Sequence, residues 1–393
     1  MEIDRSRFLK DGYLIVRELI PPPMLDSLRA DFEAIVRREW PDGPDPGRPP
    51  FQPRVYGFER HVDDANAGAL EFCMHENILG PTRQLLQVEH VGIAYLFLMC
   101  NPIAAHGPWW WHRDFGHQDG PLQGKQQSFC ANGPAHLQWN ISLYDDDVLW
   151  VLPGSHIRPN TEAENRQLST VDHSYAHGQM PQGELRHTPL PGSIPVDLKA
   201  GDGVVYANMI LHWGSNYSTR HRRIIHIGTR GFGGARYYAH GFTSSDNFRH
   251  LAPENRAEYS RLLALYDKER ATKSAAFHAI LNRDSAAFEA QLAKLHPAET
   301  GRFTCLIDLS IEPRIAMATD EAVVGGFSRA ETEQLWRQFA CLDDALRIEG
   351  GDWLPGFLIA GRVPYCIYDL PSDFDLDVFL TDLAKSPPKP NRD

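Results

Sequence analysis

A series of short apolar segments between residues 88 and 250 constrains the fold of this chain more than any other feature. Each segment is rich in β-branched or aromatic residues and is bounded by Gly, Pro or Asp, as is typical of strands. Several follow one another with no helical segment between them, which favours an antiparallel sandwich or barrel over a parallel α/β sheet. The segments are VGIAYLFLMC (91–100), HLQWNISLYD (136–145), VLWVLPG (148–154), IPVDLK (194–199), GVVYANMILHW (203–213) and RRIIHIGTRG (222–231).

Helical patterns flank this β-rich region on both sides. Near the start, PPPMLDSLRADFEAIVRREW spaces its apolar residues as an amphipathic helix does, and its prolines are tolerated in a first helical turn. Towards the end, Ser328 and Glu331 have the spacing of a capping box at a helix start. We therefore expect a β-rich domain with N-terminal helices at residues 1–250 and a mainly helical extension at residues 251–393.

Charge and composition exclude several classes of partner. The net charge of −12 argues against nucleic acid or an anionic membrane surface. No apolar run approaches the ~18 residues needed to span a bilayer, and MEIDRSRFLKDGY carries charges where a signal peptide needs an apolar core. The 6 cysteines include no CxxC pair, which fits a reducing compartment. We expect a cytoplasmic protein that acts on a small molecule.

The sharpest local motif is WWWHRDFG, in which His112 and Asp114 are two residues apart. In a strand, residues i and i+2 point to the same face, so this imidazole and carboxylate can bind one metal ion together. His212, at the end of a later predicted strand, is the candidate third ligand. Two His and one carboxylate leave three octahedral positions open, as in non-haem iron(II) oxygenases. The HxD motif alone is weak evidence in a chain with 18 His, because a hydrogen-bonded surface His beside an unrelated Asp is equally simple.

An arginine pair, Arg222 and Arg223, follows His212 closely. A guanidinium group can bind a carboxylate through two parallel hydrogen bonds. Such a group suits the distal carboxylate of 2-oxoglutarate, and a metal-dependent hydrolase has no need for it. The arginine pair therefore favours an oxygenase over the two alternatives that keep the same fold, a divalent-metal hydrolase and a cupin-like binding module without oxygenase turnover.

Five motifs in sequence resemble the phytanoyl-CoA dioxygenase family of iron(II)- and 2-oxoglutarate-dependent oxygenases. They are FLKDGYLIVRELIPPPMLDSLR near the start, WHRD (111–114), LWVLPGSH (149–156), LKAGDGVVY (198–206) and HWGSNYSTRHRR (212–223). The resemblance covers residues 5 to 235. It implies a double-stranded β-helix, which is a cupin-like jelly roll, with Fe(II) held by His112, Asp114 and His212, and with 2-oxoglutarate and O2 as cosubstrates.

The same resemblance implies an arginine for 2-oxoglutarate. Alignment through Asn216 places that role on Arg222, whereas counting directly from His212 places it on Arg223; we favour Arg222. A second departure from the family pattern is YDDDVLWVLPGSH, which lacks the usual Asn-Gly turn. This departure concerns a loop near the mouth of the jelly roll and not the metal site.

Other residues near these motifs have two interpretations each. Tyr95 and Met99 lie on one face of a predicted strand, where they either contact 2-oxoglutarate or pack in the core. Ser218 either hydrogen-bonds the cosubstrate or caps a loop. Residues that flank the triad are candidates for weak substrate contacts or for ordinary packing and solvation. These flanking residues are Trp111, Arg113 and His117.

The predicted reaction is hydroxylation of a C–H bond in a small molecule, such as a specialised metabolite, with release of succinate and carbon dioxide; desaturation, epoxidation and ring formation are alternatives on the same iron site. Related halogenases have a small residue at the position of Asp114, which leaves room for halide, so a carboxylate there favours hydroxylation. The C-terminal helices carry no chemical motif, and a homodimer formed through them is one expected role.

Overall fold

The computed structural model describes most of the first two-thirds of the chain and the principal helices of the remainder. The described residues are 2–43, 54–100, 111–114, 126, 129–169, 188–214, 221–232, 246–295, 309, 312–313, 316, 326–346 and 378. The chain divides into two compact units, of which the first comprises residues 1–114, 133–231 and 238–264, and the second residues 115–132, 232–237 and 265–393. The division expected at residue 250 remains a prediction.

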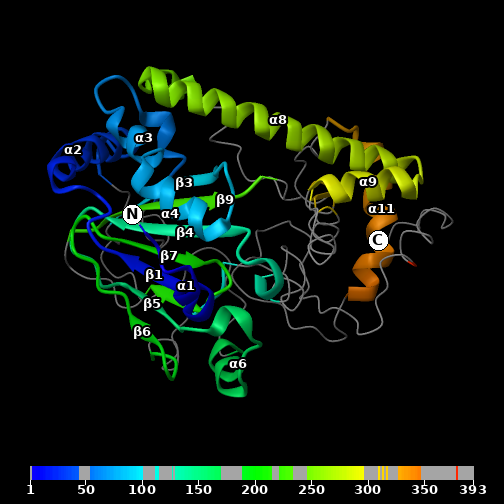
Figure 1. Ribbon diagram of the computed structural model, residues 1–393, viewed down its shortest axis with the longest axis horizontal. Helices are drawn as coiled ribbons and strands as arrows, with labels where there is room; N and C mark the ends of the chain where they lie inside the picture. Colours follow the sequence, from blue (N-terminus) through cyan, green and yellow to red (C-terminus); the bar gives the residue numbers. More distant parts are fainter. Residues whose placement is uncertain are drawn as a thin grey trace. The chain divides into compact units, whose positions relative to one another are not determined.

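Two antiparallel sheets form the core of the first unit (Figure 1). The large sheet has the order β1 (Tyr13–Val16), β7 (Gly203–Ala207), β4 (His136–Ser142), β9 (Arg223–Arg230), β3 (Gly92–Cys100) and β2 (Arg54–Tyr56). The small sheet has the order β6 (Ile194–Pro195), β5 (Leu149–Val151) and β8 (His212–Gly214). Every strand pairing in both sheets is antiparallel. The predicted mainly β, jelly-roll core is confirmed.

One predicted strand is wrong in its extent. GVVYANMILHW is two strands, β7 and β8, which belong to different sheets. A turn separates them, and in it the Ile210 N–H donates to the Ala207 carbonyl at 3.0 Å. A run of apolar residues cannot reveal this break, because both strands and the turn are buried. The crossing between sheets carries His212 to its place in the small sheet.

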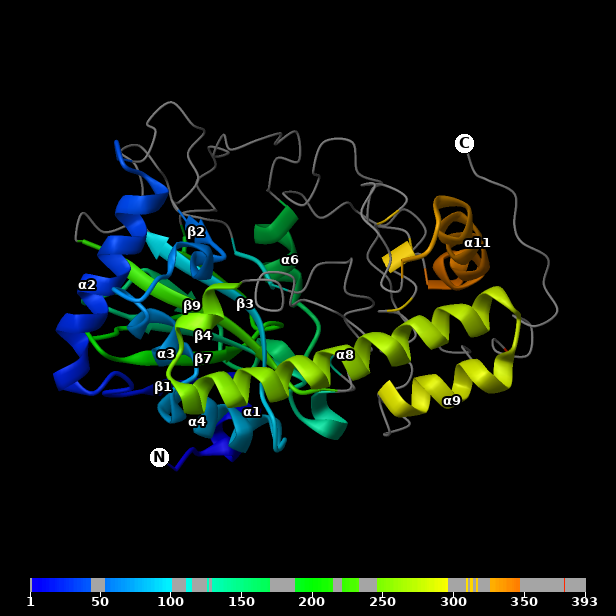
Figure 2. The ribbon, with the colours of Figure 1, turned by 90° about the horizontal axis from the view of Figure 1, so that it is seen from above.

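Helices cover the outer face of the large sheet. The elements of this layer are α1 (Arg5–Asp11), α2 (Pro22–Glu39), η1 (Phe58–His61), α3 (Gly68–Cys73) and α4 (Glu76–Leu86). Figures 1 and 2 both show α2 and α3 side by side on the same side of this sheet. Phe32 of α2 packs edge-on against Phe58, and Thr82 of α4 accepts a hydrogen bond from the Trp139 indole of β4 at 3.0 Å. The outward side chains of the sheet are thus buried by helices.

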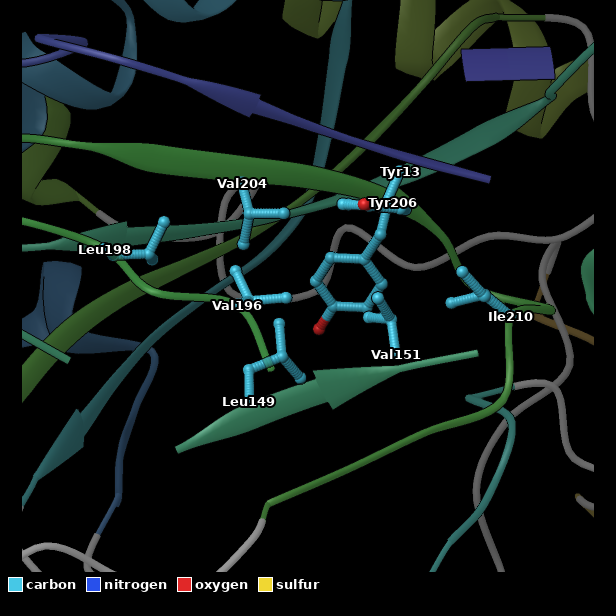
Figure 3. Packing of buried hydrophobic residues seen from close by; sticks show 8 residues of the cluster. All are labelled: Tyr13, Leu149, Val151, Val196, Leu198, Val204, Tyr206 and Ile210. Carbon is cyan, nitrogen blue, oxygen red and sulfur yellow. The ribbon is translucent and has the colours of Figure 1, made fainter. Parts of the chain in front are cut away.

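An apolar cluster fills part of the space between the two sheets. It consists of Tyr13, Leu149, Val151, Val196, Leu198, Val204, Tyr206 and Ile210. Figure 3 shows Leu149 and Val151 of the small sheet facing Val204 and Tyr206 of β7. The cluster closes the β1–β7 side of the jelly roll, so the remaining inner surface lies on β4, β9 and β3.

The N-terminal motif and the PGSH motif (153–156) meet in the fold. Gly12 ends α1 with a left-handed φ of 83°, and the Gly154 N–H donates to the Asp11 carbonyl at 3.0 Å. The His156 ring is fully buried beneath Gly12, where its Nε2–H donates to the Leu9 carbonyl at 3.0 Å. Two segments far apart in sequence are therefore joined at one buried histidine.

Three helices confirm the expected helical C-terminal region: α8 (Pro253–Leu281), α9 (Ser285–Leu295) and α11 (Arg329–Leu346). The other helical elements, which precede this region, are η3 (Ser155–Ile157), α6 (Glu162–Ser169) and η5 (Asp246–His250). The capping box at α11 is present, because the Glu331 carboxylate accepts from the Ser328 N–H at 2.8 Å and the Ser328 hydroxyl accepts from the Glu331 N–H at 3.3 Å. Among the described residues, no helix combines the length and apolar character needed to cross a membrane.

Candidate metal centre

The two candidate histidine ligands lie opposite each other across an antiparallel bridge. The His112 N–H donates to the His212 carbonyl and the His212 N–H donates to the His112 carbonyl, both at 3.0 Å. Residues in such a doubly bonded pair present their side chains on the same face. The two imidazole rings accordingly lie 4.3 Å apart between centroids. This bridge brings together residues that are remote in the chain.

Strand alternation places the neighbours of these histidines on the opposite face. Trp111 and Trp213 stack at 5.3 Å in an apolar cluster, and Trp111 is 3% exposed. The Arg113 guanidinium is buried, where it donates to the Ser155 carbonyl at 2.8 Å. Trp111 and Arg113, which the sequence offered as weak substrate contacts, therefore have packing and hydrogen-bonding roles away from the triad.

Asp114 completes a compact set of three ligands. Its Oδ1 lies 3.2 Å from His112 Nε2, and its Oδ2 lies 3.2 Å from His212 Nε2. Each of the three residues offers one ligand atom, and these atoms all lie within 4.8 Å of one another, a spacing compatible with bonds of roughly 2.1 Å to one shared ion. The residues present therefore fit a divalent ion, and they form the one such group of three among the described residues.

Hydrogen bonding and charge prepare these atoms for a cation. The His212 Nδ1–H donates to the Ile210 carbonyl at 2.9 Å, which leaves the Nε2 lone pair for a metal. Burial raises the pKa of Asp114, but when both histidines carry a proton on Nε2, the charge of His212 and the hydrogen bonds from His112 and His212 outweigh burial and hold that pKa well below its usual range. A divalent ion would take the place of these protons as the positive charge beside the carboxylate. Asp114 is therefore a carboxylate at neutral pH.

One contact to the triad was not predicted from the sequence. Gln138 of β4 donates from Nε2 to Asp114 Oδ2 at 2.7 Å and to the Tyr95 hydroxyl at 2.8 Å. Tyr95, on the inner face of β3, is thus linked to a candidate metal ligand through Gln138, by two hydrogen bonds. A lone glutamine in a strand belongs to no motif, so spacing arguments do not find it.

The inner faces of β4 and β9 carry further polar side chains near the triad. On β4 they are His136, Gln138, Asn140 and Ser142, which alternate with apolar residues directed at the helices. His226 of β9 donates from Nδ1 to Asn140 Oδ1 at 2.6 Å. Burial lowers the pKa of His226 to about 3, although Asp114 raises it, so this ring is neutral. Arg54 of β2, which sequence reasoning did not single out, is paired in register with Met99, and its positive charge also lowers the pKa of His226.

The arginine pair is divided between the two faces of the large sheet. Arg222 is paired through Nε with Asp146 Oδ2 at 2.5 Å, and both side chains are at least 95% buried. Arg223 is directed to the helical side, where its Nε lies 2.9 Å from Glu33 Oε1 of α2. By alternation Arg222 shares the face of His226, which is the interior face.

Comparison with known proteins agrees with this geometry. The sequence profile of the family described as phytanoyl-CoA dioxygenase (PhyH) matches residues 8–225, which is more than half of the chain. The chain belongs to the phytanoyl-CoA dioxygenase family. The matched segment of this family member contains the whole triad, Gln138 and both arginines. A comparison with curated proteins gives no match.

Several solved structures resemble this member of the phytanoyl-CoA dioxygenase family at low identity. AviO1 from Streptomyces viridochromogenes Tue57 is 20% identical, with a TM-score of 0.40 over 59% of this chain and 96% of that one. EctD from S. alaskensis with 2-oxoglutarate and 5-hydroxyectoine is 15% identical, with a TM-score of 0.41 over 58% and 75%. HygX from Streptomyces hygroscopicus with nickel and 2-oxoglutarate is 14% identical, with a TM-score of 0.44 over 58% and 88%.

Of three further predicted site residues of this family member, the structure describes one. Met99 lies on the inner face of β3, paired in register with Ile224, and is 8% exposed. Ser218 and His117 lie outside the described residues. Their predicted contacts with cosubstrate and substrate remain predictions.

Proposed function

We propose that this protein is an iron(II)- and 2-oxoglutarate-dependent oxygenase that hydroxylates a C–H bond of a small molecule, with release of succinate and carbon dioxide. The observation that supports it is the convergence of two imidazole Nε2 atoms and one carboxylate at 3.2 Å spacings. Membership of the phytanoyl-CoA dioxygenase family supports the same function. Iron(II) held by His112, Asp114 and His212 would supply the oxygen activation that protein side chains cannot provide.

The protein's own groups prepare the site for that ion and its cosubstrate. Asp114 supplies a carboxylate oxygen beside both Nε2 atoms, and the hydrogen bond from His212 Nδ1 to Ile210 fixes the ring that presents Nε2. Three ligands leave three octahedral positions, two for the keto acid end of 2-oxoglutarate and one for oxygen.

Arg222 is the residue that we propose for the distal carboxylate of 2-oxoglutarate. It lies on the interior face, whereas Arg223 is engaged with Glu33 on the helical face. Arg222 donates to Asp146 through Nε, and this contact fixes the orientation of the guanidinium group. The terminal nitrogens of a guanidinium so held are the ones that form a fork for a carboxylate.

Anaerobic titration with iron(II) and 2-oxoglutarate tests the proposal, because the complex of the two has a weak visible charge-transfer band. The wild-type protein should develop the band, and Asp114→Ala should lose it. Arg222→Ala should weaken 2-oxoglutarate affinity about tenfold or more while iron affinity changes little. Arg223→Ala is the matched control and should leave 2-oxoglutarate affinity near the wild-type value.

Two results would contradict this assignment. A wild-type protein that binds iron(II) but never forms the 2-oxoglutarate complex would favour a metal-dependent hydrolase or binding module. A larger effect of Arg223→Ala than of Arg222→Ala would place the cosubstrate on the other arginine. The expected homodimer, the cytoplasmic location and the identity of the hydroxylated substrate remain predictions that this titration does not address.

A further inference from the structure

Gln138 contacts the triad from outside it. Its side chain is 3% exposed, and its Nε2 donates to Asp114 Oδ2 at 2.7 Å. The same nitrogen donates to the Tyr95 hydroxyl at 2.8 Å. An amide nitrogen has two N–H donors, so both donors of Gln138 are used by these two acceptors.

The Asp114 charge determines which way this amide is turned. The Gln138 Oε1 atom is buried and has no hydrogen-bond partner among the described residues. Leaving a buried acceptor unpaired is unfavourable, and the reverse orientation would direct this oxygen at a carboxylate. The hydrogen bond to Asp114 is therefore made even though it leaves the Gln138 carbonyl oxygen unpaired. An apolar side chain would avoid that cost if only packing mattered at this position.

Tyr95 is itself held in position to accept from Gln138. Its ring lies across Gly228, where an added Cβ would be only 2.4 Å from Cε1 and 2.5 Å from Cζ. The ring stacks on Phe97 at 4.8 Å and on His226 at 5.3 Å. The absence of a side chain at Gly228 thus allows the tyrosine to lie flat against β9 and to place its hydroxyl beside Gln138.

We propose that Gln138, braced by Tyr95, is a positioning residue that keeps Asp114 a monodentate ligand. Its hydrogen bond holds Oδ2, which leaves Oδ1 as the atom for the metal. A bidentate Asp114 would occupy a fourth position and leave only two. A chelating 2-oxo acid fills both, so no position would remain for oxygen. This inference rests on the function proposed above.

Nitric oxide tests it, because this gas binds iron(II) wherever a coordination position is open and gives an electron paramagnetic resonance signal. The variants are Gln138→Met, which keeps the side-chain length without a donor, and Tyr95→Phe, which keeps the ring over Gly228 without the hydroxyl. Thr82→Val is the matched control. It removes the buried hydrogen bond to Trp139, whose side chain lies on the opposite face of β4 from Gln138.

With iron(II) alone, all variants should bind nitric oxide as the wild type does. With 2-oxoglutarate added, Gln138→Met should bind it about tenfold more weakly, and Tyr95→Phe should show a smaller loss in the same direction. Thr82→Val should lose thermal stability without this change. If Gln138→Met does not fold, the result for Tyr95→Phe decides the test.

Two outcomes separate this inference from the proposed function. If Gln138→Met and Tyr95→Phe bind nitric oxide like the wild type in the presence of 2-oxoglutarate, the positioning role is wrong and the oxygenase assignment stands. If the wild-type protein forms no complex of iron(II) with 2-oxoglutarate, the proposed function fails first and this inference fails with it.

Discussion

Substitution of Gly12 by alanine should destabilise the first unit through two separate effects. Gly12 has a φ of 83°, and an alanine held in the left-handed region costs about 1–2 kcal/mol. A Cβ at Gly12 would also lie 2.5 Å from His156 Nδ1 and 2.9 Å from its Cγ. That ring is fully buried and bonded to the Leu9 carbonyl, so it cannot withdraw without breaking a hydrogen bond. Overpacking of this kind costs about 1–3 kcal/mol more.

Gly43→Ala separates the backbone effect from the clash. Gly43 has nearly the same φ, 84°, but nothing lies within 4 Å of its Cβ position. Urea unfolding followed by tryptophan fluorescence should show a loss of about 1–2 kcal/mol for Gly43→Ala and roughly 2–5 kcal/mol for Gly12→Ala. Equal losses for the two variants would refute the argument that the His156 ring is fixed beneath Gly12.

Two further predictions concern the buried histidine and the wall of the metal site. Burial lowers the pKa of His156 to about 4, against 6.5 when the chain is unfolded. The unfolded chain therefore binds more protons between these values, and stability should fall by up to about 1.4 kcal/mol per pH unit as the pH drops from 6.5 to 4. Unfolding free energies measured across this window should show a shallower slope for His156→Gln; an unchanged slope would contradict the assignment. Gly228→Ala should cost about 1–3 kcal/mol by displacing the Tyr95 ring. It should also weaken nitric oxide binding in the presence of 2-oxoglutarate, as Tyr95→Phe does, and wild-type behaviour in both assays would show that the ring can move aside.

The triad could be predicted because its residues leave two independent signals in the sequence. His112 and Asp114 are two apart, which is the period of a strand, and His212 ends a strand-like segment. Neither signal contains the bridge that joins them, since pairing between distant strands depends on the whole sheet topology. The structure supplies that bridge through two backbone hydrogen bonds between His112 and His212.

The positions of Arg222 and Arg223 support the choice between them that we propose, where alignment leaves both open. A gap of one residue in the motif moves the predicted role from one arginine to the other. A strand, however, sends adjacent side chains to opposite faces, so only one of the two can reach the interior. The contacts with Asp146 and Glu33 identify which one it is.

Other features could not be predicted from the local sequence, because they depend on tertiary contacts. Helix α4 contains Gly80 and Pro81, which the sequence pattern associates with loops, yet its buried Ile78 and Leu85 stabilise it by packing. Tertiary contacts therefore override the local signal here. Gln138 is a different case, because its role depends on two partners, Asp114 and Tyr95, that come from other segments.

The alternating pattern of β4 correctly predicts a strand but does not reveal that both of its faces are buried. LQWNIS alternates apolar and polar residues, which predicts one buried face and one solvated face. In the structure all six of these residues are buried. The apolar face meets the helices, and the polar face is enclosed inside the jelly roll, where Gln138 and Asn140 bond to Asp114 and His226. Alternation alone cannot distinguish water from a polar interior, because both tolerate the same side chains. Burying such a face is costly unless its groups are paired, and on β4 the pairing comes from Asp114 and His226 of other segments.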